Sequence, residues 1–562
     1  MSKFRLEIFL PLFAFLAAIL AGFLLILIDH GKSSSASLIL RFIALPATSL
    51  WLGIFLSNTK SRGDFLSSHG GRDFTFRLLL IAVFCYCLIM LSLKYLKLES
   101  LNYEFFDSGL LVNKFFRISQ ATFSEAWSIA LFEGHFQPII LIFAWLYSLF
   151  DSPFFPFAVE TLTLASGVIP LYMMANKCWG CSSSSAVLAI CYLLNPVLQF
   201  NDILGFHPDH VVLPVLLWAF FFAFIGRYQA AVLTVTCLCV VGEQWIPLGA
   251  SFGLFLIFEF QRYRLGLLTF FLFTVFFLFL IFVLMPMFGS TNAGQFLIQP
   301  SSPYSSLFNG DILETLLKLV EPRKLFFIFF LFFPFFFLPL GSWRIMIVAI
   351  PDLVKTLLSD DMLHFAVEGH YTVGLIAVIF TGYISTLKVL SKKYGSKIIK
   401  QISLVSLVTL FGLTFSHSPL PNSFNFWSEW SAGTFSYKNY MVSERTESFR
   451  RVEGMVGNDP ELHIEVTNGG YTPALARRRL FLQLFPSPTW ADADLIVLDK
   501  SKYRAAGSDL NQSSYELRLR DAWDGLLPAG FSKVYADDFV ELWSQREEPY
   551  GGTVPKRLKE NH

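Results

Sequence analysis

The stretch SSAVLAICYLLNPVLQFNDILGFHPDH, residues 184–210, joins a long apolar run to a cluster of titratable side chains. A second apolar run, 210–226, follows directly, so His207, Asp209 and His210 lie between two hydrophobic segments. The pattern recurs through the chain, which is 54% hydrophobic and only 15% charged; soluble domains are about 45–50% apolar and about 25% charged. A bilayer core takes about 20 apolar residues to cross. The sequence therefore predicts a mostly α-helical, polytopic integral membrane protein.

The apolar runs predict about 13 membrane helices, because each approaches the length that crosses a bilayer. They cover residues 6–28, 38–57, 76–96, 156–176, 184–200, 210–226, 229–243, 246–260, 265–287, 326–340, 344–358, 371–388 and 401–417. The first run is too long for a signal peptide and no small-residue cleavage site follows it, so we expect it to be retained. Three regions are predicted: N-terminal membrane helices in 1–97, a transmembrane domain with a catalytic outer loop in 98–418, and a small α/β domain in 419–562.

The distribution of Lys and Arg predicts the orientation, since these residues concentrate in cytoplasmic loops. With the N-terminus inside, the cytoplasmic side holds Lys3, Arg5, Lys60, Arg62, Arg72, Arg77, Lys177, Arg227, Arg262, Arg264, Arg344, Lys388, Lys392, Lys393, Lys397 and Lys400. The loops 98–155, 201–209 and 288–325, the turns at 243 and 359–370, and everything after about 418 are then extracytoplasmic. The apolar run 135–150 is expected to lie at the outer interface, because counting it as a span would invert every later loop. The predicted location is the inner membrane of the cell.

Charge and cysteine content argue against several classes of function. A net charge of +1 gives no electrostatic basis for binding nucleic acid. The seven Cys lie in apolar runs or in the short loop around Cys178 and Cys181, so no disulfide framework is expected. That pair has no second Cys or His pair nearby, and a loop of small residues is the simpler interpretation.

Five predicted outer segments carry titratable side chains. They are NYEFFDSG with Glu104 and Asp107, FEGHFQP with Glu133 and His135, GFHPDH with its three groups, VVGEQWIP with Glu243, and residues 352–370 with Asp352, Lys355, Asp360, Asp361, His364, Glu368 and His370. Ionisable groups at a bilayer are costly and by default mark a functional site. A transporter more often places them near the membrane midplane on broken helices. Their position at one interface therefore predicts a single outward-facing cavity with a water-accessible active site.

Each of these residues also has a purely structural interpretation. Asp107 precedes Ser-Gly and could cap a helix starting near Leu110. Asp209 could cap the span that starts at His210, because Pro208 interrupts any helix before it. His207 and His210 could be hydrogen-bonded to loop carbonyls. Glu243 could end a helix, and Asp360 and Asp361 could lie in a solvated loop.

The order of the segments resembles the GT-C superfamily of membrane glycosyltransferases, which includes protein mannosyltransferases and lipid A aminoarabinose transferases. The resemblance rests on a long first outer loop with interfacial helices, then IPLYMMANKCWG (169–180), then SSAVLAICYLLNPVLQFND (184–202) with Asn-Pro near its outer end. FFDSG (105–109), GHFQPIILIFAWLYSLF (134–150), NPVLQFNDILGFHPDH (195–210) and IPDLVKTLLS (350–359) with a later HY (370–371) are similar to an uncharacterised bacterial family of predicted membrane proteins. The resemblance covers roughly residues 100–400. Two spans and the 58–75 loop precede the usual first helix, and Asp107 lacks the paired acid that many members show, although Glu104 is near.

The resemblance implies a sugar transferase whose base is an acid of the first outer loop. Asp107 is the first candidate, and Glu104 and His135 are the other predicted catalytic residues. The implied donor is a polyprenyl-phosphate sugar held among membrane lipids, and the acceptor is a glycan, lipid or protein. Substrate binding is predicted for His207, Asp209, His210, Glu243, Asp352, Lys355, His364 and His370.

The departing phosphate needs positive charge, which Lys355, Arg323 or protonated His207 and His210 could supply. A divalent metal ion is the alternative, since His207, Asp209 and His135 are suitable ligand types, but their spacing is too loose to assign a metal site. A transporter, flippase or accessory subunit that handles a lipid-linked glycan without chemistry is the alternative function.

The polar tail predicts the small α/β domain. An amphipathic helix is expected within 428–457, a strand in 493–503 and a hairpin in 531–545. The turn TNGGY (467–471) lies between a strand and a helix, and its pattern is not that of a nucleotide-binding loop.

Overall fold

The computed structural model of the protein describes most of the membrane part and a sheet near the C-terminus. The described residues are 69–103, 106–133, 135–150, 152–287, 319–427, 435–457, 459–466, 470–478, 480–483, 493–500 and 530–545. The predicted spans 6–28 and 38–57 and most of the outer loop 288–325 lie outside the described residues. The seven cysteines all lie within them and are free thiols.

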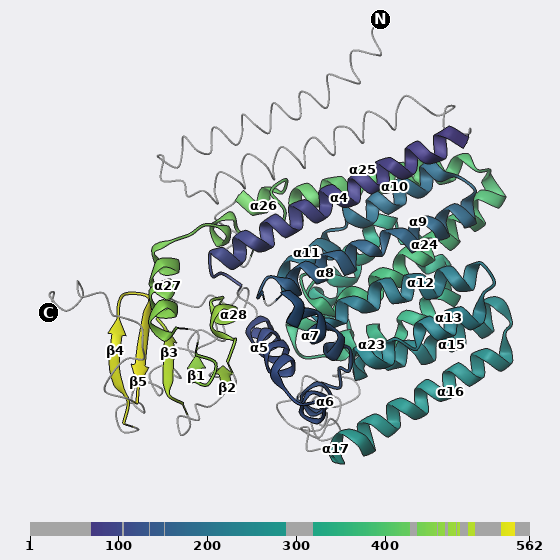
Figure 1. The fold of residues 1–562 in the computed structure, drawn as a ribbon. Coiled ribbons are helices and arrows are strands. Elements are labelled where there is room, and N and C mark those ends of the chain that lie inside the picture. Colours follow the sequence, from purple (N-terminus) through teal and green to yellow (C-terminus); the bar gives the residue numbers. More distant parts are fainter. Residues whose placement is uncertain are drawn as a thin grey trace, which may run out of the picture.

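The described part of the membrane region is almost entirely helical (Figure 1). Its α-helices are α4 (His69–Glu99), α5 (Phe106–Gln120), α6 (Phe123–Phe132), α7 (Ile139–Phe150), α8 (Phe155–Ser166), α9 (Val168–Trp179), α10 (Ser182–Leu193), α11 (Pro196–Leu204), α12 (Val212–Phe224), α13 (Tyr228–Val235), α14 (Leu238–Val241), α15 (Ile246–Phe260), α16 (Tyr263–Phe279), α17 (Met285–Met287), α21 (Pro322–Phe332), α22 (Trp343–Met346), α23 (Ile350–Leu358), α24 (Val373–Tyr394), α25 (Lys397–His417) and α26 (Phe424–Trp427). Short helical turns connect them at η3 (Pro208–Val211), η4 (Glu243–Trp245), η5 (Leu280–Leu284), η6 (Phe333–Phe335), η7 (Leu338–Gly341), η8 (Ile347–Ala349), η9 (Met362–Phe365) and η10 (His370–Thr372). The prediction of a mostly α-helical bundle is confirmed.

Five helical stretches of the described chain are long and apolar enough to cross a bilayer. They are Thr75–Glu99, Phe155–Trp179, Tyr263–Met287, His370–Tyr394 and Lys397–His417, and the bent pair α10–α11 adds a sixth if it counts as one span. The pair bends by 45° because Pro196 lacks a backbone donor, and the Asn195 side chain caps α11 by accepting from the Val197 amide. The other predicted spans after residue 75 differ: 210–226 and 229–243 form shorter apolar helices, 246–260 is the 15-residue helix α15, and 326–340 and 344–358 are each divided among short helices.

Helices α15 and α16 pack with their backbones nearly in contact. A Cβ atom at Gly253 would lie 2.6 Å from the carbonyl oxygen of Gly266, and the converse distance is also 2.6 Å. Small residues at helix interfaces allow this close approach in membrane proteins. This contact holds α16 to the bundle although few of its residues are buried, namely Gly266, Thr269 and Phe273. Most of the apolar surface of α16 is therefore available to lipid.

The C-terminal segment forms a five-stranded mixed sheet in the order β2-β1-β3-β5-β4. Its elements are η11 (Tyr437–Tyr440), α27 (Glu444–Val456), β1 (His463–Val466), α28 (Thr472–Leu475), β2 (Leu480–Gln483), β3 (Leu495–Asp499), β4 (Ser532–Ala536) and β5 (Val540–Ser544). β1 pairs in parallel with β2 and β3, and β5 pairs antiparallel with β3 and β4. The predicted hairpin in 531–545, the strand in 493–503 and the helix within 428–457 are confirmed. We call residues 435–545, where described, the sheet domain.

The sheet domain attaches to the end of α4 and to α5 (Figure 1). Leu101 and Val112 belong to the same hydrophobic core as Phe449 and Ile464. The side-chain amide of Asn113 donates to the backbone carbonyls of Ala476 and Arg478, both at 2.8 Å. These contacts place the sheet domain beside the predicted outer loop 98–155.

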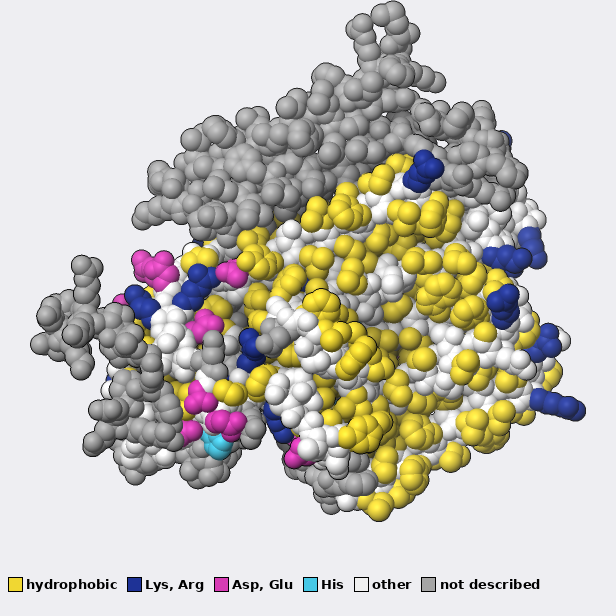
Figure 2. All heavy atoms as spheres, viewed as in Figure 1, with side chains coloured by type: hydrophobic (Ala, Val, Ile, Leu, Met, Phe, Trp, Pro, Cys, Tyr) yellow, Lys and Arg dark blue, Asp and Glu magenta, His cyan; other side chains and the backbone are white. Residues whose placement is uncertain are grey.

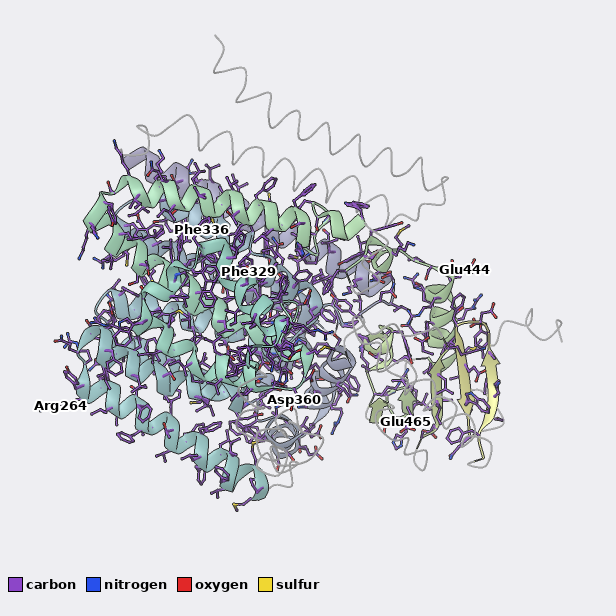
Figure 3. All side chains as sticks on the ribbon, turned by 180° about the vertical axis from the view of Figure 1, so that it is seen from behind. Arg264, Phe329, Phe336, Asp360, Glu444 and Glu465 are labelled. Atoms are coloured by element: carbon purple, nitrogen blue, oxygen red, sulfur yellow. The ribbon has the colours of Figure 1, made fainter. Side chains whose placement is uncertain are left out.

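The surface of the bundle divides by side-chain type (Figure 2). Hydrophobic side chains cover most of the visible face, while Lys and Arg gather along the edge that lies away from the sheet domain. Figure 3 labels Arg264 at that end and Glu465 on the sheet domain at the other. On this face of the bundle, basic side chains are thus most frequent at the end away from the sheet domain.

Candidate functional site

Three helices bury a lysine between two carboxylates inside the bundle. The Nζ atom of Lys94 on α4 lies 2.5 Å from Glu160 of α8 and 2.6 Å from Asp202 of α11, and all three side chains have 0% exposure. Asp202 also accepts hydrogen bonds from the hydroxyls of Tyr86 (2.8 Å) and Thr161 (2.6 Å). Buried charges are costly unless they are paired and hydrogen-bonded. This group meets both conditions.

Three histidines lie against this group. The Nδ1 atom of His210 contacts Oε1 of Glu160. The His207 ring stacks on that of His370, with centroids 3.9 Å apart and an interplanar angle of 13°, and lies 5.7 Å from that of His210. The side chains of Glu160 and of the three histidines are all buried. We call the set the acid–imidazole cluster: Lys94, Glu160, Asp202, His207, His210 and His370.

The turn between α11 and α12 brings two of these histidines inside. Gly205 has φ 150°, a conformation that side-chain-bearing residues rarely adopt. His207 is extended, as expected before proline, and Pro208 starts η3. No side chain caps η3 or α12, so the prediction that Asp209 acts as an N-cap is wrong. Asp209 is buried instead and binds other segments.

Asp209 joins the GFHPDH turn to two distant segments. Its carboxylate accepts hydrogen bonds from the Trp245 indole at 2.6 Å and the Gln244 amide at 3.0 Å. The Nε2 atom of His370 lies 3.8 Å from the same carboxylate. Residues 207–210, 243–245 and 370 therefore meet, although long stretches of sequence separate them.

The Asp352–Lys355 pair on α23 extends this region. The two charged groups are 2.8 Å apart, and Asp352 is buried. The ammonium group of Lys355 lies 4.3 Å from the centre of the Trp245 ring. A Cβ atom at Gly374 would lie 2.7 Å from the Asp352 carboxylate, so the start of α24 packs directly on it. Lys355 is thus already paired with a carboxylate.

His135 and Glu243 form an ion pair between the α6–α7 loop and η4. The His135 Nδ1 and Glu243 Oε1 atoms are 2.6 Å apart, and the backbone amide of Phe136 donates to the other carboxylate oxygen at 3.0 Å. The His135 side chain is 63% exposed and that of Glu243 12%. The Glu243 carboxylate raises the pKa of His135 to about 9. Burial alone would raise the pKa of Glu243, but the charge and hydrogen bond of His135 bring it below its usual range.

His364 lies in η9 at the edge of the same region. Its ring centre is 4.3 Å from that of Tyr371, and burial lowers the pKa of His364 to about 4. A neutral imidazole cannot supply positive charge at neutral pH. Nearby, Arg323 is exposed and contacts the sulfur of Met362, whereas Lys324 is buried and donates to the Leu357 carbonyl at 2.7 Å.

Two predicted catalytic residues, Glu104 and Asp107, are not fully described by the structure. Glu104 lies outside the described residues. Asp107 lies in α5, but its side chain is outside the description. Because α5 begins at Phe106, Asp107 occupies the first helical turn, and the interpretation of Asp107 as the cap of a helix starting near Leu110 is wrong.

Residues on either side of the first turn of α5 nevertheless contact segments that carry the acid–imidazole cluster. Phe206, which precedes His207, packs against Phe115 of α5 with ring centroids 5.4 Å apart. Tyr103 stacks on Phe157 of α8 with centroids 4.0 Å apart, one helical turn from Glu160. Asp107 therefore lies in the chain between Tyr103, which contacts α8, and Phe115, which contacts the GFHPDH turn.

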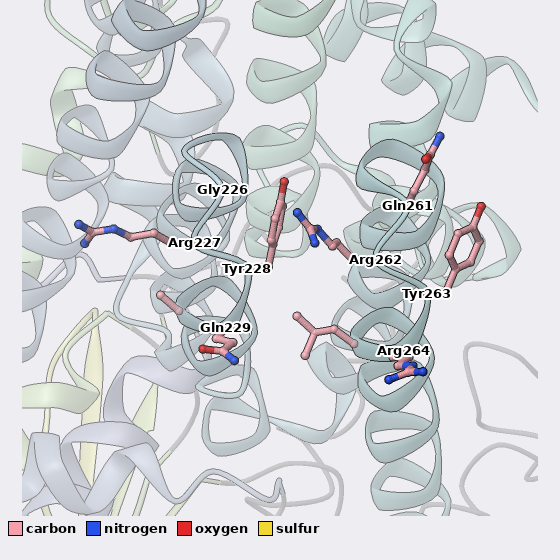
Figure 4. Close-up of a pocket in the computed structure, with 10 residues that line it drawn as sticks. Gly226, Arg227, Tyr228, Gln229, Gln261, Arg262, Tyr263 and Arg264 are labelled. Atoms are coloured by element: carbon pink, nitrogen blue, oxygen red, sulfur yellow. The ribbon is translucent and has the colours of Figure 1, made fainter.

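The predicted site residues of the GFHPDH turn and of residues 352–370 form a packed interior. Asp352, His207, Asp209, His210, His364 and His370 are between 1% and 9% exposed. A pocket of about 800 Å³ lies elsewhere, between the α12–α13 and α15–α16 turns (Figure 4). Arg227, Arg262 and Arg264 line this arginine pocket, and the Arg262 guanidinium lies 4.4 Å from the Tyr228 ring centre.

Sequence reasoning missed Lys94, Glu160 and Asp202. A signal was present, because Lys94 and Glu160 are charged residues inside the predicted spans 76–96 and 156–176. Charges at such positions are rare and face the bundle interior. Asp202 ends the motif NPVLQFND, and its neighbours in the sequence do not distinguish it from an acidic residue of a solvent-exposed loop.

Two of the solved structures that resemble the chain are distant from it in sequence. ArnT from Cupriavidus metallidurans bound to undecaprenyl phosphate is 14% identical with a TM-score of 0.47, and the match covers 86% of this chain and 99% of that one. The Archaeoglobus fulgidus oligosaccharyltransferase AglB, in complex with an inhibitory peptide and a dolichol-phosphate, is 12% identical with a TM-score of 0.44 over 85% of this chain and 75% of that one. Neither likeness assigns a role to a residue here.

Comparison by sequence gives a more direct result. No curated protein matches the chain. A family described as "Predicted membrane protein (DUF2079)" matches residues 97–448, well over half of the chain. That range contains α5–α7, the complete GFHPDH turn, η4, α23 and η10. The chain therefore belongs to the DUF2079 family of predicted membrane proteins.

Proposed function

We propose that the protein is a membrane glycosyltransferase that moves a sugar from a polyprenyl-phosphate donor to an acceptor outside the membrane. The observation that supports this most is the convergence of the predicted outer segments on one region: Asp209 binds Gln244 and Trp245 and lies beside His370. Ionisable groups gathered inside a membrane bundle mark a functional site. The resemblance of the order of segments to the GT-C superfamily, through the long first outer loop and residues 169–180 and 184–202, supplies the class of chemistry.

The proposed base is Asp107. Its carboxylate takes the proton of an acceptor hydroxyl, the acceptor oxygen bonds to the anomeric carbon, and the bond from that carbon to the phosphate oxygen breaks. The leaving phosphate keeps the electron pair. Ser108 and Tyr103 flank this position, and both are buried with hydroxyls that have no hydrogen-bond partner among the described residues. A sugar bound beside Asp107 would supply partners for these hydroxyls.

His135 suits the leaving phosphate better than the acceptor proton. With its pKa raised to about 9 by Glu243, His135 is cationic at neutral pH and cannot act there as a base. It is also exposed, so a lipid phosphate can reach it. Lys355 is held by Asp352, and His364 is neutral, so neither competes with His135 for this role.

The proposed orientation places the arginine pocket in the cytoplasm and the sheet domain outside. This orientation follows from Lys and Arg, which mark the cytoplasmic side, and the proposed location is the inner membrane. The sugar donor then reaches the α5–α7 segment from the outer leaflet, among the membrane lipids.

The experiment uses the purified full chain in detergent with a panel of radiolabelled polyprenyl-phosphate sugars. Wild type is expected to release polyprenyl phosphate when the acceptor is present. Asp107→Asn should lower the rate by about 10²–10⁴-fold, the usual contribution of a positioned base. Asp538→Asn, an exposed aspartate of the β4–β5 turn, is the matched control and should keep full activity.

Two outcomes contradict the proposal. Full activity of Asp107→Asn removes Asp107 as the base. Binding of the donor by wild type without transfer, over the whole panel, favours a transporter, flippase or accessory subunit, the alternative function considered from the sequence.

A further inference from the structure

We infer that Glu160, His207 and His210 bind a divalent transition-metal ion, with Zn²⁺ the best fit to the ligand set. This goes beyond the proposed glycosyl transfer and does not rest on it, because metal occupancy is measured without any sugar or lipid donor. The site lies on the helix α8 and on the GFHPDH turn, within the acid–imidazole cluster.

The first support is geometric. One carboxylate oxygen of Glu160 and one ring nitrogen of each histidine all lie within 4.8 Å of one another. Ligands at Zn²⁺ distances of about 2.0–2.2 Å in a tetrahedron are roughly 3.4 Å apart, so closure needs side-chain shifts of about 1 Å. All three side chains are buried on backbone that is fixed by α8, Gly205 and Pro208.

The second support is the state of His210. Its side chain is 1% exposed, and in the described part of the chain neither of its ring nitrogens nor Oε1 of Glu160 has a hydrogen-bond partner. Its Nδ1 atom faces Glu160. His210 Nδ1 and Glu160 Oε1 therefore face each other without a hydrogen bond that satisfies either atom. A metal ion placed between these two atoms would be bound by both, with a ring nitrogen of His207 as the third ligand.

The third support is the charge balance. Counted as ionised, Glu160 and Asp202 contribute two negative charges, and Lys94 contributes one positive charge between them. With neutral imidazoles the acid–imidazole cluster has a net charge of −1 in a buried place, which is costly. A cation offsets this charge. Lys94 does not block it, because the ammonium contacts the Oε2 atom of Glu160 and leaves Oε1 to the histidine side.

The donor set decides the metal. Two imidazoles and one carboxylate are the ligands of catalytic zinc sites, which keep a fourth position open. Mg²⁺ and Ca²⁺ prefer oxygen ligands throughout and bind imidazole poorly. The competing explanation is a proton between His210 and Glu160, which would also balance the charge, and the metal content of the protein separates the two.

The test measures metal content of the full chain purified in detergent without chelators and dialysed against Zn²⁺. Wild type should hold about one ion per chain, and excess Zn²⁺ should raise its unfolding temperature, as any ligand of the folded state does. Mg²⁺ should do neither. His207→Gln should lose the ion and the temperature shift, and Glu160→Gln should do the same. His417→Gln, an exposed histidine of α25, is the matched control and should behave as wild type.

His207→Gln is the decisive variant, because it leaves the contacts among Lys94, Glu160 and His210 in place and is expected to fold even if Glu160→Gln does not. A wild type that binds no Zn²⁺, or a folded His207→Gln variant that keeps the ion and the temperature shift, overturns the inference. Metal bound without any sugar transfer leaves the inference standing and counts against the proposed glycosyltransferase alone.

Discussion

At one end of the bundle Lys94 is fully buried between two carboxylates, whereas at the other Arg262 lies on the surface over the ring of Tyr228. The partners of Lys94 are 66 and 108 residues away in the sequence. Arg227 and Arg262 instead take their positions from turns beside them, at Gly226 and Gln261, where the backbone is left-handed. The position of the buried charged side chain therefore depends on how distant helices pack, whereas the position of the exposed one depends on a local turn.

The largest effect should follow from removing the buried cation. Lys94→Met leaves Glu160 and Asp202 buried without their counter-charge, and breaking such a pair typically costs about 3–5 kcal/mol. Thermal unfolding in detergent should show a large drop in the unfolding temperature. Lys392→Met, at an exposed position near the end of α24, is the control. Adding Glu160→Gln and Asp202→Asn to the Lys94 variant should restore part of the loss, and no restoration would contradict charge imbalance as the cause.

A smaller effect is expected at the joint between α5 and the sheet domain. Asn113→Ala removes the donor to two carbonyls, those of Ala476 and Arg478. Leaving buried polar groups without a partner costs about 1–3 kcal/mol. Hydrogen exchange of the 470–478 backbone should accelerate while exchange in α24 stays unchanged. Equal acceleration in both places would show that Asn113 supports the whole bundle and not the joint alone.

The His135–Glu243 pair should contribute less, because His135 is largely exposed and its attraction is screened by solvent. Its pKa is raised from its ordinary value to about 9. The pair therefore stabilises the folded state fully below about pH 6.5, the ordinary value, and loses this effect as pH rises through 9. The difference in unfolding temperature between wild type and His135→Gln should shrink over that range. The corresponding change in the free energy of unfolding should be at most about 1 kcal/mol. A difference that grows with pH would contradict the assignment.

Arg262→Gln should have the smallest effect. The guanidinium is exposed and its contact with Tyr228 is a cation–π interaction, which contributes about 0.5–1 kcal/mol at exposed sites. Unfolding temperature should change little. A loss as large as that of Lys94→Met would remove the contrast between the two ends of the bundle.

The helical fold was largely predictable, since apolar length alone located α4, α24 and α25. Breaks within helices were not, because the 45° bend at Asn195–Pro196 and the short α13 and α14 depend on packing. The site was predictable in part. Polar residues in outer loops, such as Asp209 and Glu243, stand out in the sequence, but their partners do not. Lys94 and Glu160 meet only because α4 and α8 cross, and periodicity cannot show which helices cross.

The hydrogen bonds from Asn113 to residues 476 and 478 span 363 and 365 positions of the chain. During synthesis, which proceeds from the N-terminus, α5 emerges long before these carbonyls exist. The amide of Asn113 must then remain hydrated or bind a temporary partner while the later helices insert. The first outer loop can reach its final packing only when translation is nearly complete, so truncations in the sheet domain should trap the chain as an inserted but immature form.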